Sequence, residues 1–143
     1  MKGTYAAIDV AKYIINKCAV EKCPVTNLHL QKILYFIQKE YLTKKEMPLF
    51  DDEIQAWQFG PVVPEVYYHY CGFGSTQITM KYKVNIDKID MEIIDPIVEE
   101  KRNKEPWDLV DETHTPGKAW YITFENGRGN RRIISQKLIK TRG

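Results

Sequence analysis

The sequence predicts an α+β fold that is mainly α-helical. We expect one compact domain, residues 1–143, arranged around a central helix at Asn27–Lys44 and completed by a small antiparallel β element. Apolar residues recur at helical spacing along most of the chain, whereas residues 77–86 alternate as a half-buried strand does. A segment with two prolines, residues 54–67, interrupts the helices. At 143 residues, the chain is long enough to bury a substantial core.

A first helix is expected near the N-terminus, with Asp9 as its N-cap. The segment Cys23-Pro24-Val25 ends this helix and turns the chain. The apolar face of the helix comprises Val10, Ala11, Ile14, Ile15 and Cys18.

The clearest helical pattern follows, capped by Thr26 or Asn27 and extending to Lys44. It carries two apolar stripes, separated by more than about 100° around an axis with 3.6 residues per turn. The helix is therefore either central to the core or leaves one stripe for a partner. The main stripe is Leu30, Ile33, Leu34, Ile37 and Tyr41, and the second is Leu28, Tyr35 and Leu42.

The segment Ile54–Tyr67 is the most informative part of the chain. Pro61 and Pro64 lack backbone donors and restrict the residues before them, so neither a helix nor a strand is expected to run through it. Gly60 supplies the backbone freedom for a chain reversal. Because the other residues are strongly apolar, we predict an ordered, largely buried corner. A short extended piece at Ile54–Trp57 begins it.

One strand is expected in the C-terminal half. Residues 77–86 alternate between apolar and polar side chains, as in a strand with one buried face. This strand needs a partner strand, which either the piece around Ala56 or the segment Trp120–Phe124 could supply. Earlier, the residues from Val63 to Tyr70 are expected to form a short helix.

Three further helices complete the prediction. Asp95 caps the first better than Asp90 does, because Pro96 then occupies the first helical position. The charged run Glu99–Glu105 is expected to be its exposed end. A short helix then begins at Trp107 and ends near His114, and Ser135 caps a final basic helix containing Leu138 and Ile139.

Composition is that of a globular protein, with 43% hydrophobic and 28% charged residues. No apolar run approaches the ~20 residues of a membrane span, and the N-terminus lacks the pattern of a signal peptide. We therefore expect a cytoplasmic protein without a membrane partner. The three cysteines do not form a disulfide framework. A zinc site could be assembled only from poorly spaced ligands, Cys18, Cys23, His69 and Cys71.

Charge is distributed unevenly. The net charge is +2, but the stretch from Asn126 to Gly143 contains six basic residues and no acid. Such a basic end suits a nucleic acid or an acidic protein, or is simply solvated. The six are Arg128, Arg131, Arg132, Lys137, Lys140 and Arg142.

The sequence contains no signature of catalysis. Walker-type loops, G-x-S-x-G elbows, H-E-x-x-H helices and G-x-G-x-x-G turns are all missing from the sequence. His114 beside Asp111 is a conceivable general base, but no nucleophile or oxyanion donor accompanies it at a compelling spacing. We predict neither an enzyme nor a cofactor or metal site.

Four blocks in order carry a family resemblance: LQKILYFIQKEYL (30–42), MPLFDDEIQAWQFGPVVPEVY (47–67), PWDLVDETHTPGKAW (106–120) and RIISQKLI (132–139). The pattern AW-x-x-GPVVP-x-VY is the most specific, and LV-x-x-TH-x-x-G-x-x-W is a second anchor. On these residues the chain resembles the Panacea-domain family, a phage-associated group that includes the SocA-type antitoxin. The chain has Ala119 where the family commonly has proline. The motif residues expected to be structural are Trp57, Gly60, Pro61, Val62, Pro64, His114 and Trp120.

The resemblance implies a mostly helical domain that binds a co-encoded protein toxin and holds it inactive. The leading hypothesis is therefore a cytoplasmic antitoxin of a toxin–antitoxin system, acting by protein–protein interaction. One alternative is a nucleic-acid-binding regulator that uses the basic C-terminus, and another is an adaptor that delivers its partner to a protease. The residues expected to bind the partner are Tyr35, Phe59, Tyr67, Tyr68, Arg131 and Arg132.

Overall fold

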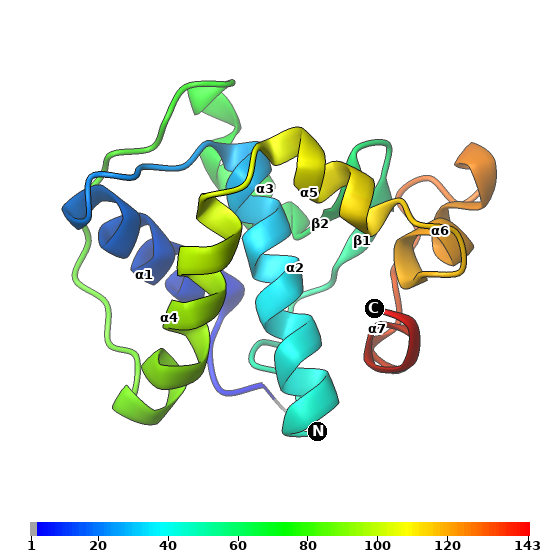
Figure 1. Cartoon of the computed structure of the whole chain (residues 1–143), viewed down its shortest axis with the longest axis horizontal. Coiled ribbons are helices and arrows are strands. Elements are labelled where there is room, and N and C mark those ends of the chain that lie inside the picture. Colours follow the sequence, from blue (N-terminus) through cyan, green and yellow to red (C-terminus); the bar gives the residue numbers. More distant parts are fainter. Residues whose placement is uncertain (1–2) are drawn as a thin grey trace.

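Helix α2 (Asn27–Lys44) runs through the middle of the molecule, and the other elements are arranged around it (Figure 1). The computed structural model describes residues 3–143; Met1 and Lys2 of the predicted domain lie outside the described residues. It confirms a mainly helical α+β domain with a two-stranded antiparallel sheet. The other α-helices are α1 (Ala7–Val20), α3 (Pro64–Tyr70), α4 (Lys88–Arg102), α5 (Pro106–Thr113), α6 (Ala119–Phe124) and α7 (Gln136–Arg142).

The prediction for α2 is confirmed at its start, at its end and on its main stripe, and Leu28 is the one residue of the second stripe that is only partly buried. Thr26 is the N-cap, and its hydroxyl accepts a hydrogen bond from the backbone N–H of His29 at 3.3 Å. α2 contacts α1, α3, α4, α5, α7 and the strand β2 (Gly60–Val62). Tyr35 and Leu42 of the second stripe are buried with the main stripe, so the helix is central to the core.

The N-cap predicted for the first helix is wrong, although the predicted apolar face is buried. α1 begins at Ala7 after Ala6, and Asp9 lies in its first turn. The backbone N–H of Ala7 instead donates to the carboxylate of Asp52 at 2.9 Å. A residue far away in the sequence thus binds one of the free N–H groups at this helix end.

The strand predicted at residues 77–86 is also wrong. This segment is extended but carries only an isolated bridge, between Val25 and Ile78. The side chain of Asn16 on α1 donates to the Tyr82 carbonyl and accepts from the Tyr82 N–H, both at 2.8 Å. A helix side chain therefore replaces the neighbouring strand. The burial partly alternates as predicted, but Met80 is exposed.

Neither predicted partner of that strand pairs with it. Trp120–Phe124 lies in the helix α6. Ala56 lies in β1 (Gln55–Trp57), which pairs with β2 in an antiparallel hairpin and also exchanges backbone hydrogen bonds with Arg131 and Arg132 at 2.6 and 2.9 Å. The small β element is therefore formed within the proline-rich corner and extended by the segment before α7.

The start predicted for the next helix is wrong as well. α4 begins at Lys88, so Pro96 lies inside it. Pro96 is on the exposed face, as is Glu92, whose carbonyl loses its helical donor and is left to water. Asp90 accepts hydrogen bonds from the hydroxyls of Tyr5 and Tyr41 at 2.6 and 2.7 Å rather than capping a helix. Within the predicted exposed end, Lys101 is buried.

Of the remaining helices, α3, α5 and α7 agree with the predictions, whereas α6 forms where no helix was predicted. α3 covers most of the helix predicted from Val63 to Tyr70, and α5 ends just before His114. Ser135 caps α7, because its hydroxyl accepts from the N–H of Leu138 at 3.1 Å. Ala119 is the first residue of α6, a position that suits the proline common in the family. Within residues 3–143, no helix has the length and apolar character needed to cross a membrane.

Replacement of Gln38 by leucine tests the role of buried side-chain amides on α2. Gln38 accepts from the N–H of Leu49 at 2.9 Å and donates to the carbonyl of Phe50 at 2.8 Å. Gln38→Leu leaves these buried backbone groups without partners, so we expect the free energy of unfolding in urea to fall by about 2–4 kcal/mol. Gln77→Leu, the same change at an exposed position, serves as the control, with a change within about 0.5 kcal/mol. Equal effects of the two substitutions would contradict this role for Gln38.

Candidate functional site

The hairpin β1–β2 projects a two-residue turn from the proline-rich corner. Trp57 pairs with Gly60 across it, which leaves Gln58 and Phe59 at the turn, both exposed. Gly60 has φ +116°, a backbone conformation that residues with a Cβ rarely adopt. The predicted corner is therefore ordered and mostly buried, but it presents an aromatic side chain to solvent at its tip.

Five aromatic side chains surround this turn and form a surface that we call the aromatic cluster. Trp57 packs edge-on against Tyr67, with ring centroids 5.0 Å apart, and Phe59 against Trp107 at 5.4 Å. The exposed fraction is 47% for Phe59, 57% for Trp107 and 55% for Tyr68. Such exposure of large apolar rings at one place is typical of an interaction surface. The cluster comprises Trp57, Phe59, Tyr67, Tyr68 and Trp107.

Arg131 is held against the cluster from the C-terminal region. Its guanidinium lies 4.3 Å from the ring centroid of Trp57 and donates to the hydroxyl of Tyr68 at 2.9 Å. The backbone N–H of Arg131 also bonds to Ala56 in β1. The structure therefore brings three predicted partner-binding residues, Tyr67, Tyr68 and Arg131, next to Trp57.

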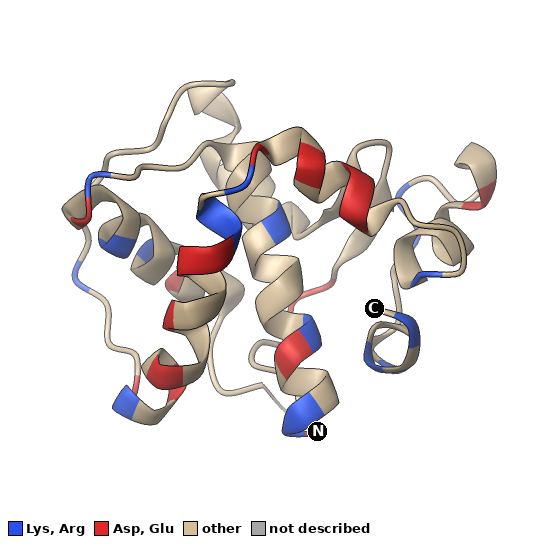
Figure 2. Ribbon diagram, viewed as in Figure 1, with Lys and Arg blue, Asp and Glu red and all other residues tan. Residues whose placement is uncertain are grey.

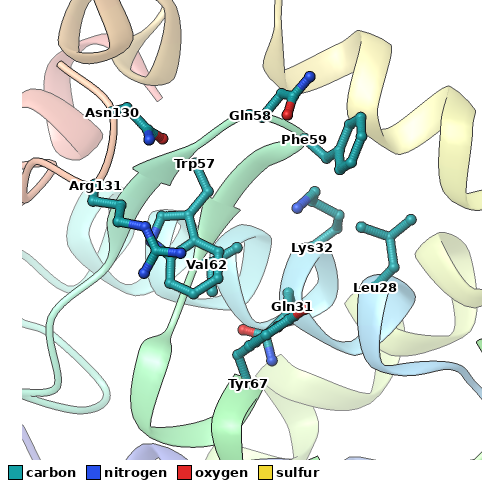
Figure 3. Close-up of a pocket in the computed structure, with 10 residues that line it drawn as sticks. All are labelled: Leu28, Gln31, Lys32, Trp57, Gln58, Phe59, Val62, Tyr67, Asn130 and Arg131. Atoms are coloured by element: carbon teal, nitrogen blue, oxygen red, sulfur yellow. The ribbon is translucent and has the colours of Figure 1, made fainter. Parts of the chain in front are cut away.

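A cleft of about 300 Å³ opens between the hairpin and α2, and Figure 3 shows the side chains around it. A second hollow of about 440 Å³ shares Leu28, Phe59 and Tyr67 with the cleft and extends to Trp107. Phe59 thus stands between two hollows of the size that takes a side chain or small ligand. The cleft is lined by Leu28, Gln31, Lys32, Trp57, Gln58, Phe59, Val62, Tyr67, Asn130 and Arg131.

Lys32 lies at the inner wall of this cleft, where sequence analysis assigned it no role. Its side chain is 0% exposed, and its ammonium donates to the carbonyl of Pro61 at 3.1 Å. A Cβ on Gly60 would meet Lys32 Cε at 2.8 Å, so the lysine lies directly below the hairpin. Burial lowers the pKa of Lys32 from 10.5 to about 7. Apolar periodicity does not reveal a lysine within an apolar helical stripe, so this residue could not be predicted from the sequence pattern.

A chain of side-chain amides joins α2 to the corner. The N–H of Val63 donates to Gln31 at 2.9 Å, Gln31 donates to Asn27 at 3.0 Å, and Asn27 donates to the carbonyl of Tyr67 at 3.1 Å. All of these groups are held by buried or partly buried hydrogen bonds, so the position of Tyr67 is set by α2.

His114 and Trp120 support the hairpin from its other side. Their rings are stacked, with centroids 3.7 Å apart and planes 2° apart. The indole N–H of Trp120 donates to the carbonyl of Trp57 at 2.7 Å. Burial, and then the nearby Lys32, lower the pKa of His114. The backbone N–H of His114 donates to the backbone carbonyl of Asp111 at 3.2 Å, but within residues 3–143 no hydrogen bond joins their side chains, so the conceivable general base lacks the expected partner.

The other predicted site residues lie elsewhere or below the surface. Tyr35 is only 3% exposed and packs edge-on against Phe36, so its ring presents almost no surface to solvent. Arg132 is exposed and lies 3.9 Å from Glu125. Pro61 and Val62 are buried in β2, and Pro64 is the first residue of α3.

Basic residues gather on α7 at the C-terminus, whereas acids mark α4 and α5 (Figure 2). Lys140 of α7 is paired with Glu46 at 2.8 Å, and this ion pair lowers the pKa of Glu46. Among the described residues, no group of three or more histidine, cysteine or acidic side chains is arranged to hold a metal ion. The poorly spaced zinc ligands considered above are not brought together.

Comparison with known proteins adds to this geometry. The family model described as "Antitoxin SocA-like, Panacea domain" matches residues 30–121, more than half of the chain. The chain belongs to the SocA-like Panacea-domain family. Antitoxin SocA of Caulobacter vibrioides (strain NA1000 / CB15N) is 45% identical over 58 residues, which are 41% of this chain and 31% of that protein. The chain thus matches about a third of the length of this relative. No solved structure matches this chain.

The matched range of the Panacea domain contains most of the candidate site. It extends from Leu30 on α2, through the hairpin and α5, to Tyr121 in α6. Arg131 lies beyond it, in the segment that pairs with β1. The site therefore combines the shared core of the Panacea domain with a cation from the C-terminal region.

Substitution of Gly60 by alanine tests the close packing of the hairpin on Lys32. An alanine at this position has to adopt φ +116°, and its Cβ has to displace Lys32 and the hydroxyl of Thr113, whose Oγ1 lies 2.9 Å from the Cβ position. We expect Gly60→Ala to lower the free energy of unfolding by about 1–3 kcal/mol. Gly72→Ala is the matched control, because a Cβ there meets nothing within 4 Å. A Gly60→Ala protein as stable as the Gly72→Ala protein would refute the packing.

The lowered pKa of Lys32 makes stability depend on pH. Between its folded value of about 7 and its ordinary value of 10.5, the unfolded chain holds a proton that the folded protein lacks. The free energy of unfolding therefore rises with pH in this window, by at most about 1.4 kcal/mol per pH unit. Urea unfolding at about pH 7.5 to 8.5 measures this slope above the range of His29 and His114, whose pKa values are also lowered, from 6.5.

Lys32→Met is the comparison for this measurement. In that variant we expect the slope of the free energy of unfolding against pH to be smaller than in the natural protein, because the contribution of Lys32 is lost. Some slope remains, because other titrating groups are still present. These include Lys39, whose pKa burial also lowers, and Cys18, whose pKa burial raises. Identical slopes in the two proteins would show that Lys32 keeps an ordinary pKa.

Proposed function

We propose that this protein is an antitoxin that neutralises a co-encoded protein toxin by binding it directly. The observation that carries the proposal is the aromatic cluster, which is exposed on the motif that marks the Panacea domain. Phe59 and Trp107 are about half exposed and pack against each other; Phe59 lines both hollows, and Trp107 lines the second. The name of the partly matched relative, Antitoxin SocA, supports the same role.

The composition of the cluster is that of a protein-binding hot spot. Tryptophan, tyrosine and arginine contribute most to protein–protein affinity when a partner covers them and excludes water. Here Trp57, Tyr68 and Arg131 contact one another before any partner arrives. A surface that is already ordered loses less conformational entropy on binding.

The C-terminal region favours this proposal over nucleic-acid binding. Lys140 is paired with Glu46, Arg132 lies 3.9 Å from Glu125, and Arg131 is bound to Trp57 and Tyr68. Two of the six basic residues in this region thus already have an acid beside them, which reduces the positive charge available to a row of phosphates.

Co-expression with the product of the adjacent gene tests the function. We expect that product to arrest growth when expressed alone, and this protein to restore growth and to co-purify with it. A harmless neighbour, or a toxin that remains active in the presence of this protein, would refute the proposal. The half-life of the toxin separates sequestration, which leaves it unchanged or longer, from delivery to a protease, which shortens it.

The double variant Phe59→Ala/Trp107→Ala tests the surface in the same assay. Loss of two hot-spot aromatics is expected to weaken binding by about 2–4 kcal/mol or more, and therefore to abolish rescue of growth. Ile89→Ala, at an exposed residue at the start of α4 on the other side of the molecule, is the control (Figure 1). Full rescue by the double variant would place the toxin on another surface.

A further inference from the structure

Arg131 and the buried amine of Lys32 border the cleft beside the hairpin, and none of the described residues that line it is an acid. Figure 3 shows Arg131 and Lys32 on either side of Trp57 and Val62. The walls contain the apolar groups of Leu28, Val62 and the aromatic rings, together with the amides of Gln31, Gln58 and Asn130. The cleft therefore combines apolar surface with positive charge, and the complementary ligand is apolar and acidic.

Lys32 has hydrogen-bonding capacity that the chain does not use. An ammonium carries three donors, yet within residues 3–143 the one acceptor bonded to it is the carbonyl of Pro61. No acidic side chain forms a salt bridge with it in this part of the chain. A buried cation without a counterion is costly, and a carboxylate brought by a ligand would relieve that cost.

Arg131 is similarly prepared. Its guanidinium carries five N–H donors, and one is bonded to Tyr68 while the plane lies over Trp57. Among the described residues it forms no ion pair with an acid. The guanidinium is thus held in place and still free to bind a carboxylate in a bidentate manner.

We propose that this cleft receives a segment of the toxin in which an aspartate or glutamate neighbours an aromatic or long aliphatic side chain. The apolar side chain packs between Phe59 and Leu28, and the carboxylate lies with the cations Arg131 and Lys32. This inference rests on the proposed antitoxin function and adds the chemistry of the bound segment. A nucleic acid fits less well, because the two basic side chains at the cleft, Arg131 and Lys32, suit a single carboxylate rather than a row of phosphates.

Selection of peptides tests the inference without knowledge of the toxin. A displayed library of random 12-residue peptides is panned against the full-length protein, and the recovered peptides are sequenced. We expect Asp or Glu next to Phe, Trp, Leu or Met to be enriched. In a synthetic peptide from this set, replacement of the acid by its amide is expected to weaken binding at least 10-fold. Recovery of no peptide, or of peptides without acids, would overturn the inference.

Variants of the cations assign the carboxylate to the cleft. In Arg131→Gln, the difference between the acid and amide forms of the peptide should fall from at least 10-fold to about 3-fold or less, since one of the two groups that bind the carboxylate has been removed. Arg128→Gln, at an exposed arginine outside the cleft, should keep the 10-fold difference. An undiminished difference in Arg131→Gln, or displacement of the peptide by single-stranded RNA or duplex DNA, would overturn the proposal.

Proton uptake reports on Lys32 itself. When a carboxylate arrives, the ammonium form is favoured, so binding at about pH 8 should take up protons in the natural protein but not in Lys32→Met. Calorimetry in two buffers of different ionisation enthalpy measures this uptake. His114→Gln is the control for the neighbouring titratable group, and it should still take up protons. Circular dichroism checks that Lys32→Met is folded; if it is not, absence of uptake in the natural protein is the contradicting result.

These outcomes are separate from those of the co-expression test. A toxin that is neutralised by a protein with no preference for acidic peptides would refute the inference and leave the antitoxin function intact. A harmless neighbouring gene product would refute the function, whatever the peptides show.

Discussion

Polar side chains on a helix that is buried on all sides hold this structure together. Buried backbone donors and acceptors require partners, and the segments packed on α2 are too irregular to satisfy one another through a sheet ladder. Gln38 bonds to the backbone of Leu49 and Phe50, Gln31 to that of Val63, and Lys32 to that of Pro61. α2 therefore supplies hydrogen bonds that elsewhere come from neighbouring strands.

The same arrangement makes the hairpin rigid enough to display aromatic residues. Its strands are only three residues each, and an isolated hairpin of this size is barely stable in water. Lys32 bonds it from below, and the indole N–H of Trp120 bonds the carbonyl of Trp57 from the side. Phe59 thus projects from a fixed support, which is what a preformed binding surface requires.

Local patterns predicted those parts of the fold that depend on neighbouring residues. The helical periodicity of α2 and the caps Thr26 and Ser135 are local features, and the structure confirms them. Predictions failed where a distant group changed the outcome. The carboxylate of Asp52 bonds the start of α1, and Asn16 takes the place of a strand beside Tyr82.

Spacing and residue type within short segments were enough to predict the family, the central helix and the position of the proline-rich corner. The folded structure was needed to show that Tyr35 is buried, that Phe59 is exposed and that Lys32 lies beneath the hairpin with no acidic partner among residues 3–143. Burial and charge pairing depend on contacts between segments far apart in the chain. Periodicity within one segment cannot specify which side of α2 meets the hairpin or which meets the core.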